Sequence, residues 1–438
     1  MATHVRGYNG GVRNVEESSH TMRLPALMPG LVALPPSKSH VLRALILAAS
    51  SGETVQLRYE HGSGWGEAGE DILRGIDCAK ALGAEVDVQG GSMRLSPSEE
   101  VPSGGGLSVG EAGFLGRVVP TCAALCRSGR WLIHAAGSLR GRRSPALWAA
   151  LRAAGVEVQD DLGWPNEIQG AREAGELHLQ GAGSSQELSA LWIALASSGG
   201  GEVRVSGDVP SAPYLDLTQS VLEAFGSRVE HSAGRYIVSP VLYSPKAVIE
   251  AEVDASAAAV ALCAGVISGV RIEVPAPSIG SAQGDWKVVE HLREFGCLIE
   301  EGGGRLVAAG GPQGGAELDL SGEPDLAPAL AAVAAHVALK SGAASTFSGL
   351  HTLDGKESRR GQVLCQGFKE AGVACEWRDP VMEFNGTASA TGEQVIDSAG
   401  DHRMAFAFAL FGVSAGSVSV GSPDCIAKSW PNFWTSMG

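Results

Sequence analysis

A repeat of about 70 to 76 residues, which runs through most of the chain, constrains the fold more than any other feature. Five amphipathic stretches each end in a glycine and continue into a strand-like run, and each glycine has the position of a left-handed helix C-cap. A unit repeated at a fixed spacing indicates an array of like units rather than unrelated domains. The five glycines are Gly83, Gly155, Gly226, Gly296 and Gly372.

A second kind of helix recurs with the same period and carries almost no charge. A helix that is apolar on every face belongs in a protein interior. The sequence therefore predicts six buried helices and six amphipathic outer ones, the last of the outer ones being the short tail after Lys428. The buried bodies cover residues 42–49, 118–126, 188–196, 257–267, 327–339 and 404–411.

Short β-like runs at 54–58, 201–206, 269–274 and 417–420 lie between these helices. Helices and strands that alternate in this way indicate an α/β fold with apolar helices inside and amphipathic helices outside. A TIM barrel would repeat at about 30 residues and does not fit. Six units exceed one core, so we expect two lobes of three units each. We place one lobe at 36–249 and the other at 250–438 together with 1–35, of which residues 1–23 form a frayed extension.

Composition excludes several classes of protein. The net charge of −15 argues against a general nucleic-acid binder. No uninterrupted apolar run reaches the roughly 18 residues that span a bilayer, so no membrane partner is expected. The eight cysteines form neither a Cys-x-x-Cys pair nor a Cys/His cluster, which predicts no metal site. Reduced thiols and a cytoplasmic location are the simplest interpretation.

The first buried helix has an unusual start, because Ser37, Lys38 and Ser39 precede an apolar body in which Arg43 is the single charge. The N–H groups and partial positive charge of a helix N-terminus favour an anion. A buried helix with a serine cap and a solvated lysine would produce the same stretch, so these residues alone leave the choice open.

The same kind of polar start recurs along the chain. If the repeats are related by rotation, their like ends face one cleft that holds several cations, hydroxyls and helix N-termini. Each helix end stabilises an anion by about 0.3–1 kcal/mol. The pattern therefore predicts ligands that carry several negative charges. Besides those named above, the residues at helix starts are Gly113, Arg142, Ser184, Ser185, Gln186, Tyr214, Asp254, Gln283, Asp285, Asp325, Lys356, Glu357, Arg360, His402, Arg403 and Lys428.

A series of motifs in a fixed order makes the chain recognisable, and the match runs from about residue 30 to the end. The chain resembles the 5-enolpyruvylshikimate-3-phosphate (EPSP) synthase family. It is less similar to the related enzymes that act on UDP-N-acetylglucosamine, which lack the Ser-Lys-Ser and Asp-His-Arg-Met-Ala motifs. The motifs are Pro36-Ser-Lys-Ser-x-x-x-Arg43, Ser184-Ser-Gln186, Ser211-x-Pro-Tyr214, Gln283-Gly-Asp285, Pro324-Asp325, Lys356-Glu-Ser-x-Arg360, Asp401-His-Arg-Met-Ala405 and Ala427-Lys428.

The resemblance implies two lobes, each of three βαβαββ units, that close on phosphoenolpyruvate and shikimate 3-phosphate. It implies a cytoplasmic monomer that needs no metal or organic cofactor. Asp325 would take the proton of the attacking 5-hydroxyl beside Lys356, and Glu357, oriented by His402, would transfer protons at the methylene carbon; Lys38 is also a catalytic candidate. The residues that would hold phosphoenolpyruvate are Lys38, Gly113, Arg142, Gln186, Arg360, Arg403 and Lys428. Those that would hold shikimate 3-phosphate are Ser39, Arg43, Ser184, Ser185, Ser211, Tyr214, Asp325, Thr352 and Lys356.

Several residues depart from the family pattern. In the glycine-rich loop, Glu111 places a carboxylate beside an anion site, so it must turn away, pair with Arg117, or mark a different ligand. Phe114 replaces a small hydroxyl residue and is expected to crowd the donor pocket and weaken glyphosate, a phosphoenolpyruvate-site inhibitor of the family. Pro36 replaces a small residue, Thr352 an asparagine and Arg359 an aspartate, and Asp354-Gly355 replaces a basic and apolar approach to Lys356.

These departures leave alternatives for the acceptor. A paralogue that transfers the enolpyruvyl group to another phosphorylated acceptor, such as a nucleotide, would keep the donor residues, and a silent member would only bind anions. The glycine-rich stretch at 62–69 is not a dinucleotide site, because it lacks the acidic residue that such a site needs, and we expect a flexible loop there.

Overall fold

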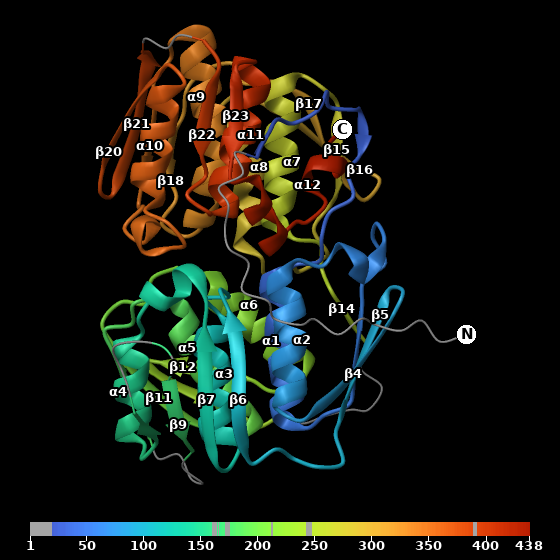
Figure 1. The fold of residues 1–438 in the computed structure, drawn as a ribbon, viewed down its shortest axis with the longest axis vertical. Helices are drawn as coiled ribbons and strands as arrows, with labels where there is room; N and C mark the ends of the chain where they lie inside the picture. The colour runs from blue at the N-terminus through green and yellow to red at the C-terminus, as the bar shows by residue number, and fades with distance from the viewer. Residues whose placement is uncertain are drawn as a thin grey trace.

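The computed structural model describes residues 20–159, 164, 166–170, 176–211, 213–241, 248–388 and 392–438. The chain forms two lobes stacked along its longest axis (Figure 1). The lower lobe in that view holds helices α1 to α6, and the upper lobe holds α7 to α12. This two-lobed α/β architecture confirms the predicted fold class.

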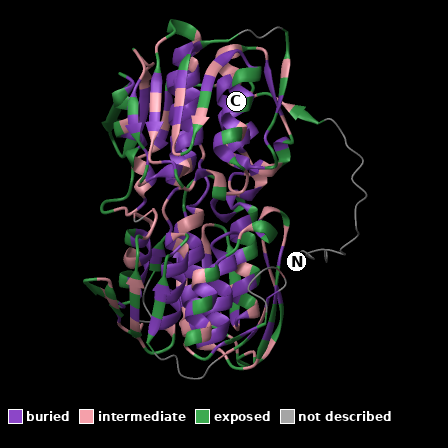
Figure 2. Cartoon of the chain, turned by 90° about the vertical axis from the view of Figure 1, so that its left-hand side faces the viewer, coloured by how far each residue is buried: buried purple, intermediate pink, exposed green. Residues whose placement is uncertain are grey.

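Six apolar helices form the cores of the lobes, as the repeat predicted. Most residues of these helices are buried, and Figure 2 shows the buried residues concentrated inside each lobe. Side chains of Ser37, Ser184, Asp254 and Asp401 cap four of them by accepting backbone N–H groups. In the lower lobe the helices are α1 (Lys38–Ser51), α3 (Leu115–Cys126) and α5 (Ser185–Ser197); in the upper lobe they are α7 (Ala255–Ser268), α9 (Ala327–Ser341) and α11 (His402–Ala415).

Amphipathic helices cover these cores. The predicted C-cap glycines all have positive φ, as at Gly83 (96°) and Gly226 (73°), which glycine adopts without a steric penalty. The predicted sixth outer helix is represented by a short 3₁₀ segment, η6 (Pro423–Lys428), and by α12 (Phe433–Ser436). The others are α2 (Glu70–Ala81), α4 (Pro145–Ala153), α6 (Pro213–Ala224), α8 (Val288–Glu294) and α10 (Arg360–Glu370).

The described strands form six sheets, three in each lobe. In each, a central strand pairs with one parallel and one antiparallel neighbour. The lower sheets are β14 (Val248–Glu250), β3 (Val55–Arg58), β5 (Ser92–Pro97) and β4 (Ala84–Gln89); β6 (Gly104–Gly110), β7 (Arg130–Ala135), β9 (Asn166–Gln169) and β8 (Glu157–Val158); and β10 (Leu177–Gln180), β11 (Gly201–Ser206), β13 (Arg235–Val238) and β12 (Val229–Ser232). The upper sheets are β16 (Leu298–Gly302), β17 (Arg305–Gly310), β15 (Ile272–Pro275) and β2 (Gly30–Leu31); β18 (Glu317–Asp319), β19 (Ser345–Ser348), β21 (Val381–Thr387) and β20 (Val373–Arg378); and β1 (Thr21–Met22), β23 (Val418–Gly421) and β22 (Gln394–Asp397).

Two strands are exchanged between the lobes. β2 precedes α1 in the chain but pairs with β15 in the upper lobe, whereas β14 precedes α7 but pairs with β3 in the lower lobe. The two crossing segments lie side by side, because Ser37 N donates to Glu252 O at 2.8 Å and Asp254 N donates to Pro35 O at 3.0 Å. The expected lobe boundary between residues 249 and 250 falls within β14 and stays a prediction.

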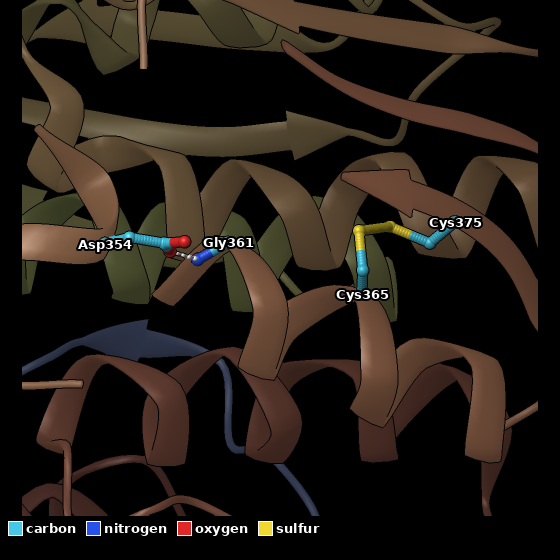
Figure 3. The surroundings of a disulfide bond; sticks show 4 residues. All are labelled: Asp354, Gly361, Cys365 and Cys375. Carbon is cyan, nitrogen blue, oxygen red and sulfur yellow. Dashed lines mark hydrogen bonds between the residues drawn. A yellow bond between two sulfur atoms is a disulfide. The ribbon is translucent and has the colours of Figure 1, made fainter. Parts of the chain in front are cut away.

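Three local expectations need correction or restriction. The frayed extension was predicted through residue 23; residues 1–19 lie outside the described part, but Thr21–Met22 form β1 against β23. The loop expected at 62–69 instead contains a 3₁₀ turn, η1 (Gly64–Glu67), with Trp65 and Glu67 buried. Asn432 Nδ2 donates to the Glu67 carboxylate at 2.7 Å and ties this turn to the C-terminal segment. A disulfide joins Cys365 of α10 to Cys375 of β20 (Figure 3), so the expectation of fully reduced thiols was wrong for this pair.

Candidate active site

The predicted site residues converge between the lobes. Sixteen of the eighteen line one small cavity of about 70 Å³. Thr352 lines an adjoining cavity, and Lys428 reaches the cluster through Glu357. The sixteen are Lys38, Ser39, Arg43, Gly113, Arg142, Ser184, Ser185, Gln186, Ser211, Tyr214, Asp325, Lys356, Glu357, Arg360, His402 and Arg403.

Most of the polar helix starts lie at this cavity, but three that the repeat also placed there, Asp254, Gln283 and Asp285, do not line it. α1 begins at Lys38, α5 at Ser185 and α11 at His402, so three capped N-termini of buried helices meet there. The ammonium of Lys38 lies 3.2 Å from Asp71 at the start of α2. Helix N-termini and cations from both lobes make the cavity suited to anions.

Asp325, in η4 (Pro324–Leu326) before α9, accepts from groups of both lobes. Its carboxylate lies 2.9 Å from Arg360 and 3.2 Å from Arg403 in the upper lobe, and it accepts the Tyr214 hydroxyl of the lower lobe at 3.1 Å. Lys356 Nζ lies 3.5 Å away. Burial acts to raise the pKa of Asp325, but Arg403, Lys356 and Arg360 outweigh it and hold the pKa well below its usual range. The carboxylate is therefore ionised.

Glu357 occupies the centre of a second cationic group. Its carboxylate lies 2.7 Å from Arg360, 3.3 Å from Arg142 and 3.2 Å from Lys428. Burial acts to raise the pKa of Glu357, but these three cations lower it well below its usual range. Arg142, Arg360 and Lys428 are the cations predicted to hold phosphoenolpyruvate, so Glu357 contacts the same three cations that the prediction assigns to the donor.

Arg360 is fixed between three carboxylates and is almost completely buried. Its Nε donates to Asp401 at 2.8 Å, while its two terminal nitrogens reach Asp325 and Glu357. Burial alone would lower the pKa of Arg360, but Asp401, Glu357 and Asp325 raise it. This guanidinium therefore stays charged and sets the spacing between the two candidate catalytic carboxylates.

His402 is a buried imidazole at the start of α11. Burial, together with Lys38, Lys428 and Arg403, holds the pKa of His402 well below its usual range. Its Nδ1 has no hydrogen-bond partner in the described part of the chain. A neutral imidazole beside Glu357 fits a group that orients the carboxylate better than one that titrates.

Arg43 is the single charge in the apolar body of α1, and its guanidinium is held at all three nitrogens. It donates to Thr218 Oγ1 at 2.8 Å, to Ser39 O at 2.8 Å and to Tyr214 O at 3.4 Å. Burial lowers the pKa of Arg43 to about 10, so it remains charged at neutral pH. The guanidinium carbon lies 4.4 Å from the ring centroid of Phe114, which is a cation–π contact. Phe114 thus packs against Arg43, which the sequence predicts to bind the acceptor.

Glu111 turns away from the anion site, which is the first of the three alternatives that the sequence left open. Its carboxylate accepts from the backbone N and the hydroxyl of Ser138 at 3.4 Å each. Its backbone carbonyl, in contrast, accepts Lys428 Nζ at 3.2 Å. Arg117 makes a different bond and donates to Gly113 O at 2.9 Å. The negative side chain therefore does not contact the cavity-lining cations.

Sequence reasoning missed two supporting groups, Asp71 and Ser256. Asp71 pairs with Lys38, and Ser256 accepts from Arg403 at 3.1 Å while its own hydroxyl contacts Asp285. Asp71 lies in the first turn of α2, a position that could have served as a signal, whereas Ser256 carried none. Their partners are distant in sequence, so no local pattern could assign these roles.

No group of His, Cys, Asp and Glu that could hold a metal occurs among the described residues. In the same part of the chain, no helix is long and apolar enough to cross a membrane.

The architecture matches solved two-lobed enzymes along nearly the whole chain. EPSP synthase from Acinetobacter baumannii superposes with a TM-score of 0.73 at 20% identity and covers 95% of this chain and 97% of its own. The enolpyruvyl transferase NikO from Streptomyces tendae superposes with a TM-score of 0.65 at 13% identity and covers 95% and 96%. The fold is that of the enolpyruvyl transferases.

Sequence similarity identifies the family to which the chain belongs within this fold. The family model described as EPSP synthase (3-phosphoshikimate 1-carboxyvinyltransferase) matches residues 23–437. A 3-phosphoshikimate 1-carboxyvinyltransferase from Methanopyrus kandleri is 32% identical over 428 residues, which cover 93% of this chain and 95% of the relative. The chain belongs to the EPSP synthase family.

Proposed function

We propose that the protein transfers the enolpyruvyl group of phosphoenolpyruvate to the 5-hydroxyl of shikimate 3-phosphate and releases phosphate. The observation that carries this proposal is the pair of carboxylates, Asp325 and Glu357, that share one buried Arg360 inside a cationic cavity. Relatives along the whole chain with the corresponding name support this acceptor over a nucleotide.

The reaction needs two proton transfers on opposite sides of one bond. The acceptor oxygen attacks C2 of phosphoenolpyruvate while Asp325 takes the hydroxyl proton, and Glu357 donates a proton to the methylene carbon. The tetrahedral ketal then loses phosphate with the electron pair of the C2–O bond, and Glu357 removes a proton from the methyl group. The cations stabilise the negative charge that collects on the leaving phosphate.

The charges around Glu357 support a route by which this residue gains a proton. Arg142, Arg360 and Lys428 pair with Glu357, and the phosphate and carboxylate groups of phosphoenolpyruvate would bind the same three cations. Once those cations bind the substrate, the pKa of Glu357 rises because it loses the charges that lower it. Substrate binding would thus give Glu357 the proton that the addition step requires.

We also propose that the protein acts as a cytoplasmic monomer without a metal or an organic cofactor. One chain supplies every side chain of the candidate site, which supports a complete site in each monomer. Light scattering on the purified protein tests the monomer, and turnover in the presence of a chelator tests the absence of a metal.

Phosphate release from phosphoenolpyruvate, measured with and without shikimate 3-phosphate, tests the function. We expect release only when both substrates are present. Release with a phosphorylated nucleotide and not with shikimate 3-phosphate would assign the chain to a paralogue with another acceptor. Tight calorimetric binding of both substrates without turnover would indicate a silent anion binder.

A further inference from the structure

A second cavity of about 580 Å³ adjoins the catalytic one. The two share Arg142, Ser184, Gln186, Ser211, Lys356 and Glu357, so they form one continuous site. Five lysine or arginine side chains line the larger cavity against three carboxyl groups. Its surroundings are therefore suited to an additional negative charge.

The three carboxyl groups do not neutralise this surplus. Asp354 accepts from Gly361 N at 2.8 Å and from Trp377 Nε1 at 3.1 Å, so both of its oxygens are engaged (Figure 3 shows the bond to Gly361). Glu187 accepts from Gly183 N at 3.1 Å, and burial raises its pKa. Glu357 is already bound by its own cations.

Arg143 and Arg359 are the cations left over. Both are exposed at the cavity, and neither has a hydrogen bond or an ion pair with any residue that the structure describes. The Thr352 hydroxyl is buried in the same wall and likewise has no partner within the described ranges. A buried hydroxyl without a partner, in a cavity that also holds two unpaired guanidinium groups, indicates an anionic ligand. A guanidinium pairs with phosphate through two parallel hydrogen bonds.

The expected orientation of the acceptor indicates which of its anionic groups would lie in the larger cavity. If the acceptor's carboxylate meets Arg43 and its 5-hydroxyl meets Asp325, its phosphate must lie at the end away from Arg43. The larger cavity lies at that end, because it shares Ser184, Ser211 and Lys356 with the catalytic cavity but does not include Arg43. Serine hydroxyls supply neutral hydrogen bonds there, whereas arginines would add charge-assisted ones.

We propose that Arg143 and Arg359 bind the phosphate group of the acceptor and make the enzyme selective for a phosphorylated acceptor. This inference rests on the proposed function. The test compares the full-length wild type with the Arg359→Asp and Arg143→Ala variants. Lys369→Glu is the matched control, because Lys369 is exposed in α10, the helix that follows Arg359, and lies outside the cavity. The substitution changes the charge as much as Arg359→Asp does.

We expect the KM for shikimate 3-phosphate to rise at least tenfold in Arg359→Asp and at least threefold in Arg143→Ala. The KM for phosphoenolpyruvate and kcat should stay within twofold, and the control should match the wild type throughout. A change below twofold in the acceptor KM of Arg359→Asp overturns the inference, as does an equal rise in both KM values.

A binding measurement separates this inference from the proposed function. If the wild type shows no turnover with shikimate 3-phosphate, the proposed function fails, and calorimetry with inorganic pyrophosphate decides the inference. We then expect at least tenfold weaker pyrophosphate binding in Arg359→Asp than in wild type. Equal pyrophosphate binding to the wild type and Arg359→Asp, or no pyrophosphate binding to the wild type, overturns the inference.

Discussion

The carboxylate of Glu357 in the upper lobe lies 3.3 Å from the guanidinium of Arg142 in the lower lobe. This ion pair crosses the interface between the lobes and is partly buried, with about an eighth of each side chain exposed. In the proposed function, an anionic donor substrate and Glu357 compete for this cation. That competition links substrate binding to the protonation of the residue proposed to act on the methylene carbon.

The Glu357→Gln variant should lose phosphate release at least about a hundredfold, because the amide keeps the shape of the side chain but cannot transfer a proton. Stopped assays with both substrates measure the loss, and a thermal melt of the variant checks that the fold is retained. Turnover within tenfold of wild type would remove Glu357 from the proton transfer.

The Gly113→Ala variant should raise the KM for phosphoenolpyruvate about tenfold or more. A methyl group there would lie 2.8 Å and 2.9 Å from the two terminal nitrogens of Arg142, so the guanidinium must shift. Gly302→Ala is the control, since nothing lies within 4 Å of the added carbon. Equal KM values for both variants would show that Arg142 does not need its present position.

The Glu111→Ala variant should leave the KM for phosphoenolpyruvate and kcat within twofold of wild type. The carboxylate points to Ser138, and only the backbone carbonyl, which the substitution retains, contacts Lys428. Steady-state kinetics with phosphoenolpyruvate varied measures the effect. A KM that falls tenfold would indicate that the carboxylate repels the donor after all.

Phe114→Thr should strengthen inhibition by glyphosate about tenfold, because a smaller side chain would relieve the crowding that we predict in the donor pocket. It should also raise the KM for shikimate 3-phosphate a few-fold, since Arg43 loses its aromatic partner at 4.4 Å. Inhibition constants with phosphoenolpyruvate varied check the first effect. A glyphosate inhibition constant of the wild type as low as that of Phe114→Thr would contradict the prediction that Phe114 crowds the donor pocket.

Stability should depend on the charge state of Asp285. Burial raises its pKa from 3.8 to about 6, against the attraction of Arg403. Between these values the folded state binds a proton that the unfolded state has lost, so this group's contribution to stability falls as pH rises from about 4 to about 6. The shift of about two units corresponds to about 3 kcal/mol.

The Asp285→Asn variant should not show this fall. Urea unfolding at several pH values measures the unfolding free energy of wild type and variant. As pH rises from about 4 to about 6, the wild type should lose stability relative to the variant. Asp77→Asn, at an exposed position, serves as the control. A difference that stays constant between pH 4 and pH 7 would contradict the buried, proton-binding carboxylate.

Much of the architecture follows from local patterns. The apolar body at 42–49 lies in α1, and the one at 327–339 lies in α9, because a helix without polar faces has to be buried. Gly83 and Gly226 adopt positive φ where a helix ends, as their spacing predicted. These features depend on residues a few positions apart, which is the range over which sequence periodicity carries information.

The sequence by itself determined the two series of helices, their caps and the set of polar residues that the helix starts bring to one cavity. Only the tertiary structure decided the exchange of β2 and β14, the turn of Glu111 toward Ser138, the stacking of Arg43 on Phe114 and the pairing of Cys365 with Cys375. The physical reason is that each of these contacts selects one partner among several that are chemically acceptable. That selection depends on where the packed lobes place the side chains, and no spacing along the chain encodes it.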